Sequence, residues 1–328
     1  MSKILILSRH PESASFRQRI TLYFDSLTAA GIEYRVEPLP SKLYKTLKLF
    51  SRASGFDAVF LHKKRLPPLE NFFLRKNAKK IIYDFDDAVM FDQQHPENPH
   101  PKKLKRFAAT VKMADKIIAG NTFLADFAKQ FNDSTVILPT GLNTEEYKIK
   151  KNKPDDKIRL VWIGSGSNLL YLEHIKDSFE QIGKKYSNVV LRIICNEFFD
   201  LANMPVEKIK WSLKNQVPDL VNSDIGLAPL PDDNFTRGKC GFKILQYAAA
   251  SLPSVASPVG VNADMVQNGI NGFLAETPRQ WTDSISRLIE NPDLCIKMGQ
   301  QAEITAKNYN VLLLGKKFTD IISGIMAL

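Results

Sequence analysis

DIGLAPLPDDNFTRGKCGFKILQYAAASLPSVASPVGVNADMVQNGING, residues 224–272, is the stretch that decides the fold. It holds two short apolar runs, 225–228 and 254–256, separated by a polar loop and by a helical stretch that begins near Gly241. Short buried strands that alternate with helices are typical of a parallel sheet covered on both faces. Ligands of such sheets bind at the carboxyl ends of the strands, so we expect a site in the loops that follow them.

The same alternation extends outward from this stretch and forms two α/β series within 328 residues. A chain of this length exceeds what one hydrophobic core supports, which favours two domains. We place the first domain at residues 1–150 and the second at 151–310, with the polar stretch 147–156 as a linker. We expect the last helix, within 311–328, to pack back on the first domain.

The expected elements follow from the positions of the apolar runs and of the helix caps. Strands are expected at 3–8, 33–37, 58–62, 80–85, 116–119 and 135–138, and in the second half at 158–163, 189–195, 209–211, 225–228, 254–256 and 273–275. Helices are expected at 15–30, at 169–186 and from Asn121, as N-cap, to Gln130.

The loop and helix after strand 225–228 form a candidate anion site. Its residues are Arg237, Gly238 and Lys239 in the loop, and Lys243 and Gln246 on the first turns of the helix. Free amides at a helix start attract phosphate, and nearby cations add charge-assisted hydrogen bonds. A diphosphate could therefore bind here without a metal. The alternative is a solvated basic loop before an ordinary core helix.

Two further loops follow strands in the second half. SPVGVNAD places Gly260, Val261 and Asn262 at a helix start, where glycine permits either close approach of a ligand or a tight turn. VWIGSGSN places Gly164 and Ser165 directly after a strand. This turn lacks the third glycine of the dinucleotide fingerprint, and the first strand of the chain, in KILILSRHPESASF, has no glycine. A dehydrogenase is therefore disfavoured.

Three carboxylates, Asp84, Asp86 and Asp87, end a strand of the first half in KKIIYDFDDAVMFD. Such groups can orient a substrate hydroxyl or stabilise positive charge that develops in a reaction, so we assign Asp86 and Asp87 as catalytic. Asp84, together with Arg17 after the first strand, is assigned to the acceptor or phosphate side. The alternatives are an acidic turn that caps the next helix and an exposed helical arginine. Metal binding by these carboxylates is a further alternative of lower rank.

Charge limits the class of partner. The net charge is +10, and residues 1–150 hold 25 Lys/Arg against 16 Asp/Glu, so the basic character belongs to the first half. This asymmetry indicates a polyanionic partner: an anionic membrane, a phosphorylated acceptor or nucleic acid. Nucleic acid is disfavoured because no binding motif and no basic stretch with interleaved aromatic residues is present.

The stretch from Lys42 to Arg52 (KLYKTLKLFSR) is expected to form a basic amphipathic helix with Leu43, Leu47 and Phe50 on one face. It could lie on an anionic membrane, although a core helix with a solvated basic face has the same pattern. Three cysteines without CxxC spacing, and the lack of a signal-peptide core or a run of twenty apolar residues, indicate a cytoplasmic protein. Any membrane association would be peripheral, on the inner face.

The stretch from Asp224 to Gly272 resembles the donor-binding region of GT-B glycosyltransferases of the group 1 (family 4) retaining class. In that family a DIGLxPL strand leads into a loop and helix, followed by segments like LPSVAS and GINGFL. YDFDDA, PTGLN and VWIGS are weaker matches. The resemblance implies an α/β fold of two Rossmann-like, doubly wound domains facing a cleft. It also implies a hexosyltransferase-type enzyme that uses a nucleotide sugar, with retention of configuration and without metal or other cofactor.

This sequence departs from the family pattern at several positions. The family often has two glutamates eight positions apart, where this chain has Gly238 and Gln246, and a histidine where it has Asp86. Many relatives also carry an Arg and a Lys in the loop that begins here at Gly164, so Lys243 becomes the preferred phosphate cation. The expected acceptor is a glycan or a lipid-linked glycan, in polysaccharide synthesis. The alternative is a catalytically degenerate protein that binds a nucleotide sugar as a partner subunit.

Overall fold

The computed structural model describes residues 2–152 and 154–327. These residues form two compact units: unit 1 comprises residues 2–142, 233–240 and 311–327, and unit 2 comprises 143–232 and 241–310. The expected linker, 147–156, belongs to unit 2, where Lys151 Nζ lies 2.8 Å from Asp224 Oδ1. Lys153 of that linker and Leu328 of the expected last helix lie outside the described residues.

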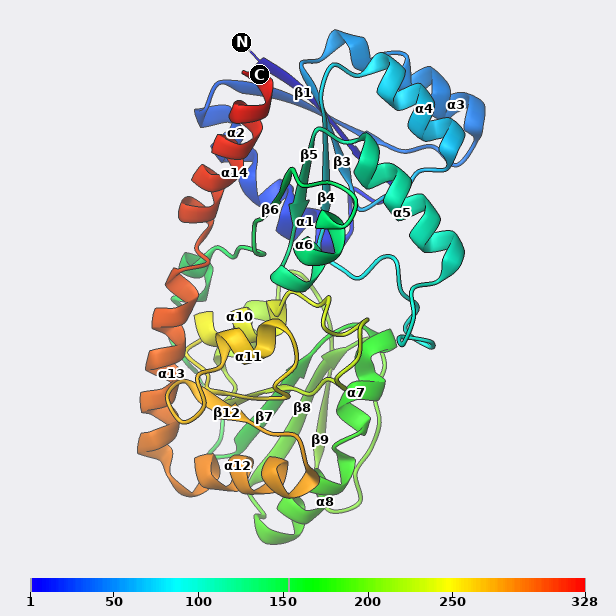
Figure 1. Ribbon diagram of the computed structural model, residues 1–328. Helices are drawn as coiled ribbons and strands as arrows, with labels where there is room; N and C mark the ends of the chain where they lie inside the picture. The colour runs from blue at the N-terminus through cyan, green and yellow to red at the C-terminus, as the bar shows by residue number, and fades with distance from the viewer. Residues whose placement is uncertain (1, 153, 328) are drawn as a thin grey trace. The chain divides into compact units, whose positions relative to one another are not determined.

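Unit 1 contains a parallel sheet of six strands in the order β2-β1-β3-β4-β5-β6. The strands are β1 (Ser2–Ser8), β2 (Ile32–Pro38), β3 (Ala58–His62), β4 (Ile81–Phe85), β5 (Lys116–Ala119) and β6 (Thr135–Ile137). Its helices are α1 (Ala14–Arg19), α2 (Phe24–Ala29), α3 (Leu43–Phe50), α4 (Pro68–Asn77), α5 (Pro101–Met113), α6 (Thr122–Lys129) and α14 (Val311–Met326), as Figure 1 shows.

Unit 2 contains a second parallel sheet of six strands, in the order β12-β11-β10-β7-β8-β9. The strands are β7 (Ile158–Ile163), β8 (Val189–Cys195), β9 (Val206–Lys210), β10 (Ile225–Ala228), β11 (Ser254–Ala256) and β12 (Gly272–Leu274). Its helices are α7 (Leu169–Glu173), α8 (Lys176–Lys185), α9 (Gln216–Val221), α10 (Phe242–Ala249), α11 (Val261–Met265), α12 (Pro278–Glu290) and α13 (Pro292–Lys307). The predicted fold class, two doubly wound α/β domains, is confirmed.

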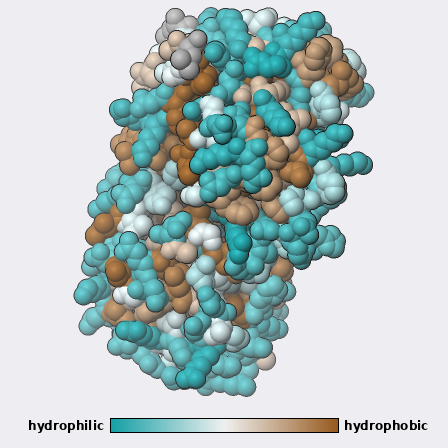
Figure 2. All heavy atoms as spheres, viewed as in Figure 1, coloured by the Kyte–Doolittle hydropathy of each residue, from teal (hydrophilic) through white to brown (hydrophobic). Residues whose placement is uncertain are grey.

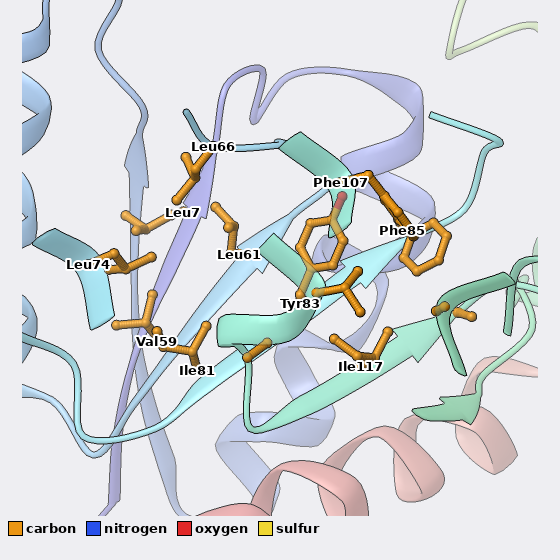
Figure 3. Packing of buried hydrophobic residues seen from close by; sticks show 14 of the residues in the cluster. Leu7, Val59, Leu61, Leu66, Leu74, Ile81, Tyr83, Phe85, Phe107 and Ile117 are labelled. Carbon is orange, nitrogen blue, oxygen red and sulfur yellow. The ribbon is translucent and has the colours of Figure 1, made fainter. Parts of the chain in front are cut away.

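The two faces of the unit 1 sheet carry different side chains because successive residues of a strand point to opposite sides. On β4, Ile81, Tyr83 and Phe85 join the large apolar core beneath α3 to α6. Figure 3 shows this core, in which the ring centroids of Phe85 and Phe107 lie 5.2 Å apart. Asp84 of the same strand therefore faces the other side.

That other face of the sheet is covered by α1, α2 and the C-terminal helix α14. Phe318 of α14 stacks on Tyr23, with ring centroids 4.9 Å apart, and contacts the edge of Phe60 on β3. Gly315 of the same helix leaves room for Ser26 of α2. The last helix thus completes the second layer of unit 1.

Three predicted helices differ from the structure. The helix expected at 15–30 is divided at Ile20, whose φ of −128° ends α1, and the helix expected at 169–186 is divided into α7 and α8. Helix α3 buries Thr46, Leu49 and Phe50, so Leu43 lies outside the buried face and is 46% exposed. Asn121 is confirmed as the N-cap of α6, since its side chain accepts from Leu124 N.

Candidate functional site

The strand order of each sheet indicates where ligands bind. It reverses between β1 and β3 in unit 1 and between β7 and β10 in unit 2. In open parallel sheets such a reversal leaves a crevice at the carboxyl ends of the two strands. The loops at this edge of each sheet are therefore the candidate ligand sites.

In unit 1, Asp84 lies inside a fully buried ion pair. The register of β3 and β4 makes His62 and Asp84 neighbours on one face of the sheet. Arg19 of α1 pairs with the Asp84 carboxylate, and His62 Nδ1 lies 2.9 Å from Asp84 Oδ2. All three side chains are buried. Asp84, predicted on the acceptor side, is thus surrounded by protein groups.

Asp86 follows β4 and is held by hydrogen bonds from two directions. Ser15 Oγ donates to its two carboxylate oxygens at 2.9 and 2.8 Å, and Lys63 Nζ lies 3.0 Å from Oδ1. Burial alone would raise the pKa of the Asp86 carboxyl, but Lys63, His62 and Arg19 outweigh burial and hold that pKa well below its usual range. Asp86 is therefore an anion at any physiological pH.

Lys63 occupies an unusual backbone conformation directly after β3. Its φ is +60°, in the left-handed region that residues other than glycine seldom adopt. The turn brings the Lys63 ammonium between Asp86 and Asp87, and it pairs with both carboxylates. Burial alone would lower the pKa of this ammonium, but the two carboxylates raise it above its ordinary value. Backbone strain of this kind is commonly stored at functional sites.

The loop of residues 233–240 belongs to unit 1, although it connects β10 to α10. Asn121 Nδ2 donates to the carbonyls of Arg237 and Lys239, at 3.2 and 3.0 Å. The Lys239 ammonium lies 3.6 Å from Asp87 Oδ1. Of the residues predicted to bind the donor, Arg237, Gly238 and Lys239 therefore lie beside the carboxylates of unit 1.

Gly238 is glycine because unit 1 leaves no space for a side chain there. A Cβ on this residue would lie 2.5 Å from Ala88 Cβ and 2.8 Å from Ala88 N. Cys240 lies at the end of the same loop with Sγ 3.2 Å from the Asp86 carbonyl oxygen. Because the loop fits so closely, the glutamate that the family pattern has at this position could not be accommodated at position 238.

Four residues that contact Asp84, Asp86 or Asp87 in unit 1 were not among the predicted site residues. They are Ser15, Arg19, His62 and Lys63. His62 is the last residue of a buried strand, so the rule that pointed to Asp84 could have identified it too. The predicted Arg17 donates from Nη1 to the carbonyl of Glu12 in its own loop.

In unit 2, Lys243 lies on the first turn of α10. Its ammonium lies 5.2 Å from the centroid of the Trp162 ring, a cation–π contact. A Cβ at Gly164 would lie 2.5 Å from that ring and 3.2 Å from Lys243 Cε, so glycine is required there. Gly241, with φ +66°, is the N-cap of α10, and no side chain caps the helix. The predicted Lys243 and Gly164 are therefore neighbours beside uncapped backbone amides.

Helix α11 begins beside the end of β10. Its N-cap, Gly260, has a φ of +51°, and Val261 is its first residue. Asn262 is buried, and its Nδ2 donates to the carbonyl of Ala228 at 3.3 Å. The loop at Gly260 is thus fixed to the carboxyl end of β10, which is next to β7 in the sheet. Ser165, after β7, lies 3.0 Å from Ser167, measured between their hydroxyl oxygens.

Gln246 has a protein partner in the structure. Its side chain is only 3% exposed, and Nε2 donates to the hydroxyl of Tyr147 at 3.2 Å. Burial raises the pKa of that tyrosine. The proposed contact of Gln246 with a ribose remains a prediction.

Two features are absent from residues 2–152 and 154–327. No group of three or more His, Cys, Asp or Glu side chains in this range could hold a metal ion. Within the same residues, every helix is too short or too polar to cross a membrane.

Comparison with known proteins gives consistent sequence matches. Residues 144–291 match the family model of glycosyl transferases group 1. Over 207 residues the chain is 28% identical to "Putative glycosyltransferase EpsD" of Bacillus subtilis (strain 168). This match covers 60% of the chain and 46% of the relative, so it spans less than half of that protein.

Solved structures resemble the whole chain. Sucrose-phosphate synthase from Thermosynechococcus elongatus has a TM-score of 0.80 at 14% identity, with 100% of both chains covered. Anabaena Alr3699/HepE in complex with UDP and glucose has a TM-score of 0.74 at 15% identity, covering 99% of this chain and 100% of the other. Residues 144–291 are therefore similar in sequence to group 1 glycosyl transferases, and the chain has the GT-B fold.

Proposed function

We propose that the protein is a glycosyltransferase that moves a sugar from a nucleotide-sugar donor to a glycan or lipid-linked glycan acceptor. The observation that carries this proposal is the start of α10 in unit 2. There, Lys243, the glycine loop after β7 and uncapped helix amides converge. Such groups bind a diphosphate through charge-assisted hydrogen bonds without a metal. The donor would thus be bound mainly by its leaving group.

The donor is proposed to carry a hexose, with transfer that retains the configuration at C1. Lys243 and the helix amides would stabilise the nucleoside diphosphate as it leaves, and Asp86 and Asp87 would stabilise positive charge on the sugar. Asp86 suits this electrostatic role because an anion with so low a pKa is a weak base. UDP-sugars are the first donors to test, since HepE has been solved with UDP and with UDP-glucose.

The donor site can be tested by calorimetric titration with UDP and with UDP-glucose. We expect Lys243→Ala to weaken binding by about 10- to 100-fold, the loss of one charge-assisted contact. Lys184→Ala, at the exposed end of α8, is the matched control and should bind as the wild type does. If Lys243→Ala binds both nucleotides normally, or if no nucleotide sugar of a wider panel binds, the donor site is wrong.

A partner subunit without catalytic activity is the second candidate. Gly238 and Gln246 replace the glutamates of the family pattern, and Gln246 donates to Tyr147. Release of UDP from bound UDP-glucose in the presence of soluble and lipid-linked glycan acceptors separates the two candidates. Turnover supports the enzyme. Tight donor binding without turnover, while a second glycosyltransferase becomes active when mixed with this protein, supports the partner subunit.

Peripheral association with an anionic inner membrane surface is proposed for α3 and α4. Apolar side chains are exposed on these helices: Leu43 (46%), Tyr44 (63%), Leu69 (49%) and Phe72 (62%). Figure 2 shows hydrophobic surface over α3 and α4 among hydrophilic side chains. Lys45 and Lys48 of α3 are exposed beside it. A basic helix with exposed apolar residues binds anionic lipid through both kinds of group.

Sedimentation with vesicles tests this proposal. We expect binding to phosphatidylglycerol vesicles and none to phosphatidylcholine vesicles at the same salt concentration. The double variant Lys45→Glu/Lys48→Glu should lose this binding, while Lys176→Glu on α8 of unit 2 should keep it. Equal binding by both variants would exclude α3 as the membrane contact.

A further inference from the structure

A continuous chain of hydrogen bonds runs through unit 1 from a buried arginine to Asp86. Arg19 pairs with Asp84, Asp84 Oδ2 lies 2.9 Å from His62 Nδ1, and His62 Nε2 lies 3.2 Å from Ser15 Oγ. Ser15 Oγ then lies 2.8 Å from Asp86 Oδ2. The part Asp84–His62–Ser15 has the groups and the spacing of a Ser–His–Asp catalytic triad.

The direction of the hydrogen bonds differs from that of a nucleophilic triad. An ionised carboxylate can only accept, so Asp84 takes a hydrogen from His62 Nδ1 and Asp86 takes the single hydrogen of the Ser15 hydroxyl. The Ser15 oxygen is left to accept from Lys63 Nζ, 3.5 Å away, and His62 Nε2 lies 3.2 Å from the same oxygen. A serine whose hydrogen is given to a carboxylate and whose oxygen accepts from an ammonium is a poor nucleophile.

The fold holds this chain in one geometry. His62 and Asp84 are paired in the register of β3 and β4, and the ring of Phe16 lies edge-on to the His62 ring, 5.7 Å between centroids. The Arg19 guanidinium also donates to the carbonyl of Leu138 and is fully buried. Each member therefore has little freedom to leave its partner, as a preorganised site requires.

We propose that Asp84, His62 and Ser15 are positioning residues that fix the carboxylate of Asp86 in a single orientation for sugar transfer. The catalytic part of this inference rests on the proposed function, whereas the geometric part does not. Asp86 touches the reacting sugar, and the other three groups act through it. The Ser15 hydroxyl forms no covalent bond with the substrate, because its hydrogen and its oxygen are both engaged.

The proposal predicts how the Asp86 carboxyl titrates. The charged or titratable groups that face it are Arg19 from α1, His62 and Lys63 from the end of β3, Asp84 and Asp87 from β4 and the turn after it, and Lys239 and Cys240 from the loop 233–240. Ser15→Ala removes a donor to the carboxylate, and His62→Gln removes an imidazole that favours the anion. Each should raise the pKa of Asp86 toward its ordinary value.

The measurement is a ¹³C NMR titration of protein labelled at the aspartate carboxyl carbons, with Asp86→Asn to assign the signal. We expect the Asp86 signal of the wild type to remain that of the anion down to the onset of acid unfolding. It should titrate at higher pH in Ser15→Ala and in His62→Gln. The matched control is His10→Gln, an exposed histidine that pairs with Glu12 and should leave the signal unchanged. An unchanged signal in both test variants would refute the positioning role.

Two further readouts separate the positioning role from a nucleophilic role of Ser15 and from a merely structural one. A fluorophosphonate probe, which labels nucleophilic serines, should leave Ser15 unmodified; labelling of Ser15 that is lost in His62→Gln would overturn the proposal. With a donor identified, Ser15→Ala should lower kcat on the order of tenfold while the KM for the donor stays constant. Ser15→Ala keeps the buried Arg19–Asp84 pair, so it is the variant to use if His62→Gln unfolds. The NMR titration needs no donor. A failure of the proposed function can therefore be distinguished from a failure of the positioning role.

Discussion

The two candidate sites use opposite means to place charge. In unit 1 the site consists of side chains that fix one another, with two carboxylates, Asp86 and Asp87, around Lys63 and a buried Arg19–Asp84 pair nearby. In unit 2 it consists of glycine loops, helix amides and Lys243 packed on Trp162. Substitutions should therefore act differently in the two units. In unit 1 they should affect stability and activity together, whereas in unit 2 they should affect ligand affinity alone.

The same contrast bears on the reaction. A diphosphate would be repelled by the carboxylates of unit 1 and attracted by the backbone and lysine of unit 2. Positive charge that develops on the sugar has the opposite preference. These preferences agree with the roles proposed above for Lys243 and the helix amides toward the diphosphate, and for Asp86 and Asp87 toward the sugar.

The largest expected effect comes from breaking the buried pair of unit 1. Arg19→Met keeps the volume of the side chain but leaves Asp84 buried without its guanidinium. Removal of one partner of a buried ion pair costs about 3–5 kcal/mol, and we expect the free energy of unfolding to fall by that amount. Urea denaturation monitored by circular dichroism measures the change.

Arg35→Met is the control for this experiment. Arg35 pairs with Glu37 at 2.6 Å, but its side chain is more than half exposed. An exposed pair contributes about 0–1 kcal/mol, so this variant should unfold almost as the wild type does. If the free energy of unfolding fell equally in the two variants, the buried Arg19–Asp84 pair would contribute no more to stability than the exposed Arg35–Glu37 pair.

Strands and turns of this fold could be predicted from the sequence because their signals are local. β3, β5, β7, β8, β10 and β11 have the predicted bounds, since a short apolar run between polar turns defines a buried parallel strand. The helix expected at 15–30 was wrong in extent. Its division places Arg19 against Asp84 and Tyr23 against Phe318 of α14, partners that lie far away in the sequence. Helical periodicity contains no information about such partners.

The same distinction between local signals and long-range contacts applies to the residues of the candidate sites. Asp86 follows β4 and Lys243 follows β10, so the strand-end rule was enough to select them. His62 acquires its role only through the register of β3 against β4, and Lys63 only through a left-handed turn. The position of loop 233–240 on unit 1 depends on Asn121 and Ala88, more than a hundred residues earlier in the chain. Long-range contacts of this kind cannot be predicted from a single sequence.

A smaller effect, which depends on pH, is expected from Lys63→Met. Methionine keeps the Cβ and thus the same backbone strain at φ +60°, but it removes the cation between Asp86 and Asp87. We expect the variant to be about 2–3 kcal/mol less stable at pH 7. Urea denaturation at several pH values between 7 and 3 measures this difference.

The sign of the pH dependence follows from the low pKa of Asp86 in the folded protein. A carboxyl whose folded pKa lies below its unfolded value of about 4 stabilises the fold above that pH, and this stabilisation is lost as the pH falls. Without Lys63 the pKa of Asp86 in the folded protein rises, so the free energy of unfolding of the variant falls less in acid than that of the wild type. The stability curves of variant and wild type should therefore converge toward pH 3, and parallel curves would contradict the coupling of Lys63 to Asp86.

The smallest expected effect comes from the loop that belongs to unit 1 but joins two elements of unit 2. Gly238→Ala places a methyl group against Ala88, and such overpacking costs about 1–2 kcal/mol. Gly55→Ala is the control, because a Cβ at Gly55 meets no atom within 4 Å. If the loop is fixed by this contact, amide hydrogen exchange in Gly238→Ala should accelerate in residues 233–240 while the strands of unit 2 keep their protection. Faster exchange in β10 and β11 as well would mean that the loop stabilises both units, and the contrast between the two sites would then be one of chemistry but not of stability.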